Sequence, residues 1–279
     1  MSRLRQGRRP RQGRRLTAAF AQARAENRAA LITFATVGYP TPADTADVVR
    51  ALLAGGSDVV ELGIPFSDPL ADGATIQHAS QIALEQGTTL NMAFNLVRDL
   101  RSEGVETPLV FMGYYNPFLH YGLERVVKEA AEIGLDGFIV PDLPPEEGQE
   151  FGRLARAHDL DLIPLLAPTS TESRIQANVQ AGSGFVYCVS LTGVTGAREQ
   201  LSATLPEFLG RVREHTDLPL AVGFGVSRPE HVATIAQMAE GVVSASALIN
   251  VLDDTPAARR YDALKDLVHA LRAATAHTK

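Results

Sequence analysis

Eight short apolar segments recur along the chain, and each is followed by a segment with the spacing of an amphipathic helix. The apolar segments are continuous rather than alternating, which is typical of strands buried on both faces of a parallel sheet. We predict strands over residues 31–38, 58–65, 108–116, 137–144, 160–168, 184–192, 219–227 and 241–249. We predict helices over residues 16–27, 41–56, 75–103 with a break near Gly87, 122–133, 146–158, 171–182, 205–215, from 228 onward and over 261–274.

Eight strands alternating with eight helices in about 250 residues predict an α/β fold, a single (β/α)8 TIM barrel. The segment 16–27 precedes the first strand and is predicted to add an extra N-terminal helix, with Thr41 as the N-cap of the next one. An open doubly wound sheet is the alternative. It usually carries GxGxxG after its first strand, whereas that turn reads VGYPTP here. No linker-like shift in composition divides residues 16–279, which are predicted to form one domain.

Composition and charge narrow the class of protein further. Residues 1–15 hold seven Arg and no acid, which predicts a solvated, disordered tail. The net charge of −6 and the pI of about 5.7 argue against general nucleic-acid binding. A single cysteine and the absence of a metal-binding His spacing predict no disulfide and no metal. No apolar run reaches about 18 residues and no signal-peptide pattern precedes the first helix, so we expect no membrane contact and a cytoplasmic location.

Two carboxylates near the second strand are the strongest candidates for chemistry. Glu61 lies within the apolar run DVVELGIP, and alternation places it on the inner face of the barrel with Val59 and Gly63. A carboxyl group buried there has a raised pKa and can exchange protons near neutrality. The alternative is a structural Glu paired with a buried cation. Asp72 lies at the end of the loop that follows this strand, and it is either a second catalytic acid or a turn residue. Asp68, in the same loop, is best explained as a turn residue.

Glycine-rich turns after the sixth and seventh strands, and a helix start after the eighth, predict a phosphate site. They are residues 193–196, 223–225 and 244–246. Glycines let backbone N–H groups approach a ligand, and a helix N-terminus favours an anion. Barrels often bind phosphate at these loops. The polar segment 191–202 is interpreted as a lid over the site or, equally, as a surface loop.

Several apolar and aromatic side chains are predicted on the inner face of the barrel. Tyr187 lies inside the sixth strand, where a core role with a satisfied hydroxyl group is the alternative. Phe34, Met112 and Phe224 are interpreted as a slot for a flat ring or, equally, as plain core. Cys188 alternates to the opposite face from Tyr187 and is expected to be buried and inert.

The motif ELGIPFSDPLADG closely resembles the signature of the tryptophan synthase alpha chain family. Further motifs occur in the order found in that family: FATVGYP lies before this motif, and GYYNP, PDLPPEE, SLTGVTGAR, GFGVS and SASALI lie after it. The resemblance covers about residues 16–270. It implies a lyase that cleaves indole-3-glycerol phosphate to indole and glyceraldehyde 3-phosphate by a retro-aldol reaction, without a cofactor in this chain.

The resemblance also implies roles for individual residues. Glu61 matches the family's general acid and base, and Asp72 matches the acid that binds the indole N–H group. The substrate-binding positions match Phe34, Met112, Tyr187, Thr195, Gly196, Phe224, Gly225, Ala245 and Ser246. Thr195 matches the lid residue that contacts Asp72. Ala245 stands where Gly is frequent, which affects the fine geometry of the phosphate site, and Leu191 stands where some members carry a basic residue.

The resemblance implies a partner, the tryptophan synthase beta chain, in an αββα heterotetramer. Indole would pass through a tunnel to pyridoxal phosphate on that partner and condense with L-serine to L-tryptophan. The loop around residues 68–69 and Asp142 match the family's contacts with the partner. Two alternatives remain: an independent indole-releasing lyase of the same family, and a non-catalytic barrel that only binds a phosphorylated ligand.

Overall fold

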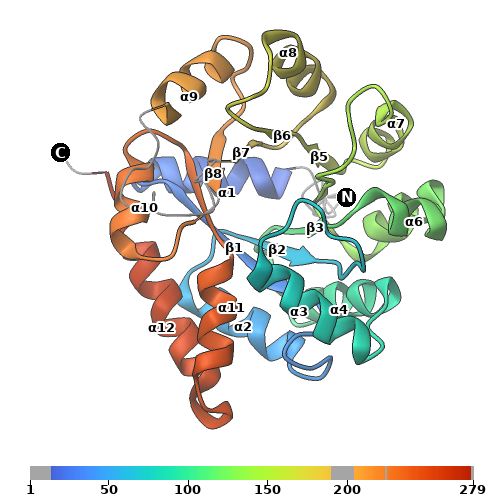
Figure 1. Cartoon of the computed structure of the whole chain (residues 1–279), viewed down its shortest axis with the longest axis vertical. Helices are drawn as coiled ribbons and strands as arrows, with labels where there is room; N and C mark the ends of the chain where they lie inside the picture. The colour runs from blue at the N-terminus through green and yellow to red at the C-terminus, as the bar shows by residue number, and fades with distance from the viewer. Residues whose placement is uncertain (1–13, 190–203, 224, 278–279) are drawn as a thin grey trace, which may run out of the picture.

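A ring of parallel strands forms the centre of the protein, and helices surround it (Figure 1). The computed structural model describes residues 14–189, 204–223 and 225–277. The strands are β1 (Ala30–Thr36), β2 (Val59–Gly63), β3 (Leu109–Met112), β4 (Gly137–Ile139), β5 (Asp161–Ile163), β6 (Leu165–Leu166), β7 (Val186–Val189), β8 (Leu220–Gly223) and β9 (Gly241–Ser244). They lie side by side in the order β5-β4-β3-β2-β1-β9-β8-β7-β6.

The helices follow the strands in the alternation that the sequence predicts. They are α1 (Arg14–Ala25), α2 (Thr45–Gly55), α3 (Ala74–Glu85), α4 (Leu90–Ser102), α5 (Tyr115–Tyr121), α6 (Leu123–Ile133), α7 (Gln149–Ala157), α8 (Glu172–Ala181), α9 (Leu205–Arg213), α10 (Pro229–Ala236), α11 (Ser246–Asp254) and α12 (Arg260–Ala273), with a 3₁₀ turn, η1 (Ala257–Arg259). Among the described helices, none has both the length and the apolar composition needed to cross a membrane.

The ring closes between β5 and β6, which are neighbours in the chain. β5 pairs with β4, and β6 pairs with β7, so the two ends of the sheet are one stretch of backbone. Pro164 lies between them and lacks an N–H group, which interrupts the ladder, although its carbonyl accepts a hydrogen bond of 2.9 Å from the Tyr187 N–H. The predicted strand 160–168 therefore becomes two short strands, and the predicted barrel is confirmed over the open sheet.

Alternation along β2 separates the inner core of the barrel from the outer layer beneath the helices. Val59 packs in the inner core, while Val60, Leu62 and Ile64 pack in the outer layer. The prediction that Glu61 faces inward is confirmed by this pattern. The same alternation holds in β7, where Tyr187 is inner and Cys188 is outer and fully buried.

Helix α1 covers the end of the barrel at which the strands begin (Figure 1). Leu16, Phe20 and Ala23 enter the inner core, and the Phe20 ring lies 5.4 Å from the Phe185 ring. The predicted extra N-terminal helix is thus confirmed, but it begins at Arg14, two residues inside the segment assigned to the Arg-rich tail. Arg15 forms an ion pair of 3.1 Å with buried Asp136, and this contact explains why the helix extends further than predicted. Residues 1–13 lie outside the described residues.

Several predicted element boundaries differ from the structure, and two of them have an identifiable cause, one a distant contact and the other a local turn. The predicted strand 108–116 ends at Met112, and α5 begins at Tyr115, whose N–H donates to the Asp142 carboxylate at 2.9 Å. The helix predicted from Thr41 begins only at Thr45. Thr41 instead accepts a 3.3 Å hydrogen bond from the Asp44 N–H in a preceding turn.

Candidate active site

Glu61 lies in the middle of β2, on the inner face, with 1% of its surface exposed. Among the described residues, neither of its carboxylate oxygens has a hydrogen-bond partner, and no basic side chain pairs with it. Burial alone raises the pKa of the Glu61 carboxyl to about 8, because the charged form is disfavoured in an apolar interior. The arrangement does not fit a structural ion pair, and it suits a group that gives and takes a proton near neutrality.

Asp72 is held at the end of the β2–α3 loop by backbone and tyrosine contacts. Its N–H donates to the Pro69 carbonyl at 3.1 Å, and its carboxylate accepts a hydrogen bond from the Tyr114 hydroxyl. Burial raises the pKa of Asp72 to about 6, while the bond from Tyr114 opposes that rise. Asp68, by contrast, is exposed, and its carboxylate accepts a 2.6 Å bond from Ser67, as expected of a turn residue.

Tyr114 is a residue that the sequence reasoning missed. It is 4% exposed, and its hydroxyl oxygen also accepts a 2.8 Å hydrogen bond from the Ala71 N–H. Its ring stacks on Phe66 with the centroids 5.2 Å apart. The Tyr114 side chain, which follows β3, therefore fixes both the backbone of the β2–α3 loop and the carboxylate of Asp72. The motif GYYNP contained this residue, but only the fold places it beside Asp72.

Tyr187 brings the two carboxylates into one site. It projects from the inner face of β7, and a Cβ atom added at Gly223 would overlap its hydroxyl group and ring. Burial raises the pKa of Tyr187 well above its usual value, and the negative charges of Glu61 and Asp72 raise it further. The electrostatic influence of both acids on Tyr187 indicates that β2, its following loop and β7 contribute to one site.

An apolar wall flanks Glu61 at the same level of the barrel. A Cβ atom added at Gly63 would overlap the ring of Phe34, so this glycine makes room for that ring. Met112 is the register partner of Gly63 on the other side and packs against the inner core. Thr36, at the inner-facing end of β1, is 3% exposed, and its hydroxyl has no partner among the described residues. Alternation from Phe34 could have identified Thr36 from sequence.

The start of α11 forms the described part of the predicted phosphate site. Ala245 occupies the N-cap position and Ser246 begins the helix, whose first turn carries no acid. Gly225 follows β8 with φ of +76°, a left-handed conformation that favours glycine. The nearby backbone is held by a 3.1 Å bond from Ser244 to the Val226 carbonyl. The start of α11 presents backbone N–H groups and the positive end of a helix dipole to an anion.

The remaining predicted site residues, Thr195, Gly196 and Phe224, lie outside the described residues. The whole of the predicted lid, residues 191–202, also lies outside the described residues. Within residues 14–189, 204–223 and 225–277, no group of three or more His, Cys, Asp or Glu side chains could hold a metal ion. The described site therefore consists of buried Glu61, half-buried Asp72, a tyrosine, an apolar wall and a helix start.

Comparison with known proteins covers almost the whole barrel. A statistical model of the family described as "Tryptophan synthase alpha chain" matches residues 20–277. The tryptophan synthase alpha chain of Roseiflexus sp. (strain RS-1) is 50% identical over 258 residues, which span 92% of this chain and 99% of that one. The alpha chain of Chloroflexus aggregans is 50% identical over 261 residues, 94% and 98% of the two chains. A solved Mycobacterium tuberculosis tryptophan synthase structure superposes with a TM-score of 0.86 at 39% identity, covering 95% of this chain and 99% of that one.

Proposed function

The chain belongs to the tryptophan synthase alpha chain family, and from this premise we propose that Glu61 and Asp72 carry out its lyase reaction. The reaction is the cleavage of indole-3-glycerol phosphate to indole and glyceraldehyde 3-phosphate. The observation that supports the assignment most directly is the buried, unpaired Glu61 carboxyl with a pKa of about 8. Such a group can act in both directions of proton transfer at neutral pH.

The proposed chemistry needs two proton transfers and one stabilised charge. Protonated Glu61 donates its proton to C3 of the indole ring, which makes the ring an electron sink. The Glu61 carboxylate then accepts the proton of the side-chain hydroxyl group. The C–C bond breaks, its electron pair restores the aromatic ring, and the hydroxyl carbon becomes the aldehyde. Asp72 accepts a hydrogen bond from the indole N–H and stabilises the positive charge that develops on the ring.

Substrate binding completes the proposal. Phe34 and Met112 flank the acids and offer the indole ring an apolar wall, with Phe224 assigned there from the family resemblance. Tyr187 lies on the inner face of β7, and the charges of both carboxylates raise its pKa. The phosphate group is assigned to the backbone of Gly225, Ala245 and Ser246, at the start of α11, together with Gly196 and the lid residue Thr195. No cofactor is assigned to this chain.

An indole-3-glycerol phosphate cleavage assay tests the assignment of the acids. We expect Glu61→Gln to abolish cleavage while the variant still binds glycerol 3-phosphate, because the amide keeps the shape of the side chain but cannot transfer the proton. Asp72→Asn is expected to lower turnover severely. As a control, Glu132→Gln changes an exposed acid on α6 and should leave turnover unchanged. Near-normal turnover of Glu61→Gln would refute the assignment, and binding without cleavage by the unaltered chain would favour the non-catalytic barrel.

We further propose that the chain acts with a tryptophan synthase beta chain as an αββα heterotetramer, in which pyridoxal phosphate is bound by the beta chain. The side chain of Leu70, between Asp68 and Asp72, is 95% exposed. An exposed large apolar side chain on a loop that reaches the active site suits a partner contact. We include the predicted cytoplasmic location in this proposal, which cell fractionation would test.

Size-exclusion chromatography with a beta chain, together with measurement of rate activation, tests the partner. We expect a complex and faster cleavage, both weakened by Leu70→Asp while the solitary cleavage rate is retained. High solitary activity with no complex would instead identify an independent indole-releasing lyase.

A further inference from the structure

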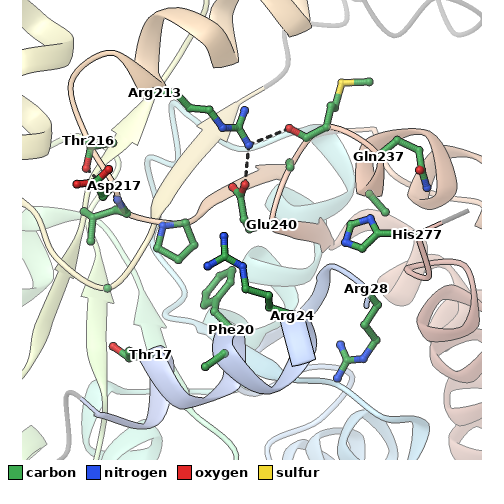
Figure 2. Close-up of a pocket in the computed structure, with 17 residues that line it drawn as sticks. Thr17, Phe20, Arg24, Arg28, Arg213, Thr216, Asp217, Gln237, Glu240 and His277 are labelled. Carbon is green, nitrogen blue, oxygen red and sulfur yellow. Dashed lines mark hydrogen bonds and ion pairs between the residues drawn. The ribbon is translucent and has the colours of Figure 1, made fainter. Parts of the chain in front are cut away.

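A second cavity lies at the opposite end of the barrel from the acids. Its volume is about 930 Å³, and Figure 2 shows its walls. One wall is a face of α1 that carries Thr17, Phe20, Ala21 and Arg24. The others are residues that directly precede β7, β8 and β9, together with the C-terminal segment. The cavity therefore opens at the end where strands begin, whereas Glu61 and Asp72 face the end where they finish.

The walls of this cavity are tied to one another. Arg213 donates to the Glu240 carboxylate at 2.7 Å and to the Met238 carbonyl at 3.0 Å (Figure 2). Glu240 also accepts a 2.9 Å bond from the Leu220 N–H. The C-terminal wall is held by a 3.0 Å bond from the His277 N–H to the Asn27 carbonyl. These bonds join α9, β8, the turn before β9 and both ends of the barrel domain, so the pocket is formed before any ligand arrives.

The charges around the cavity leave one arginine available. Arg28 is fully engaged, because it pairs with Asp58 at 2.7 Å and with Glu26 at 2.6 Å. Arg213 is engaged by Glu240 in the same way. Arg24 is exposed, and no hydrogen bond or ion pair joins its guanidinium group to the part of the chain that the structure describes. Its guanidinium group extends into the cavity beside Phe20 (Figure 2).

We propose that this cavity binds small aromatic monocarboxylates. A free guanidinium group offers a carboxylate two parallel, charge-assisted hydrogen bonds. Phe20, Leu218 and Met238 supply apolar surface in the same cavity for the ring of the ligand. Asp217, on the wall across the cavity (Figure 2), repels a second negative group, so the site selects a single carboxylate over a dianion. The proposal is independent of the lyase activity.

A ¹⁹F NMR titration of the full chain with 4-fluorobenzoate tests the site, and 4-fluorobenzamide serves as the neutral probe of the same shape. We expect the benzoate to bind and the benzamide to bind at least about tenfold more weakly, which is the usual worth of a charge-assisted hydrogen bond. Arg24→Gln should weaken benzoate binding by a similar factor, and Ala21→Trp, which fills the cavity from an exposed position of α1, should abolish it.

Two controls separate this site from the rest of the molecule. Arg125→Gln removes another exposed arginine, on α6, and should leave benzoate binding unchanged. Saturating glycerol 3-phosphate, which is directed to the catalytic end, should not displace the benzoate. The proposal is overturned if the benzoate fails to bind, if Arg24→Gln binds it as the unaltered chain does, or if glycerol 3-phosphate displaces it.

Discussion

Replacing Glu61 by Gln should change the pH dependence of stability as well as the activity. The unfolded chain exposes the Glu61 carboxyl, whose usual pKa is 4.5, whereas the folded chain raises that pKa to about 8. Between these two pH values the unfolded state has released the proton and the folded state still holds it. The free energy of unfolding of the unaltered chain must therefore fall as pH rises through this range.

The size of the effect follows from the two pKa values. One pKa unit corresponds to about 1.4 kcal/mol, so the gap between 4.5 and about 8 corresponds to roughly 5 kcal/mol at most. The neutral amide of Glu61→Gln has no such dependence. Below pH 4.5 the protonated acid and the amide are nearly equivalent, and above pH 8 the buried charge penalises only the unaltered chain. The free energy of unfolding of Glu61→Gln, relative to that of the unaltered chain, should therefore increase by several kcal/mol from pH 5 to pH 9.

Urea unfolding of both chains at intervals from pH 5 to pH 9 measures this difference, because every other titrating group is shared and cancels in the comparison. Glu132→Gln, at an exposed position, should have the same pH dependence of the free energy of unfolding as the unaltered chain. The reasoning is refuted if the stability difference between Glu61→Gln and the unaltered chain stays constant with pH. That result would mean that Glu61 is hydrated or paired in solution and keeps its ordinary pKa.

Two further variants test contacts on either side of the barrel. Tyr114→Phe removes the hydrogen bond that favours ionised Asp72, so the pKa of Asp72 should rise above about 6. The acid limb of the pH profile of kcat/KM should then move to higher pH. An acid limb that does not move would contradict the contact between Tyr114 and Asp72. Arg101→Met removes the 2.6 Å partner of fully buried Asp136 and should cost roughly 3–5 kcal/mol in urea unfolding. The exposed Arg98→Met, on the same helix, should cost less than about 1 kcal/mol, and equal losses would show that Arg101 acts as a surface group.

The barrel and the position of Glu61 could be predicted from sequence because both depend on local periodicity. Continuous apolar runs identify strands buried on both faces, and a period of two along β2 separates Val59 from Val60 and Leu62. The same alternation places Glu61 on the inner face, in the middle of an apolar run. The burial of Glu61 and its raised pKa follow from that placement without knowledge of any distant contact. The sequence pattern alone therefore predicts Glu61 as a candidate catalytic residue.

The geometry around Asp72 could not be predicted in the same way. Its loop is held by Tyr114, whose hydroxyl bonds to the Ala71 N–H 43 residues earlier in the chain. Periodicity carries no information about such a contact, so a turn role for Asp72 remains open from sequence. The start of α5 has the same cause, because its Asp142 partner lies 27 residues beyond Tyr115. Loop geometry at the rim therefore depends on neighbouring βα units, which only the closed barrel brings together.

Asp136 and Glu61 are both buried acids, but their surroundings differ. Asp136, near the start of β4, is paired with Arg15 and Arg101 and accepts a 2.9 Å bond from the Leu109 N–H. Glu61, by contrast, has no partner among the described residues. A buried charge with partners contributes to a defined structure, whereas an unpaired one lowers stability unless a ligand compensates. Asp136 therefore contributes to the stability of the folded chain, whereas Glu61 lowers that stability until a ligand supplies the missing partner.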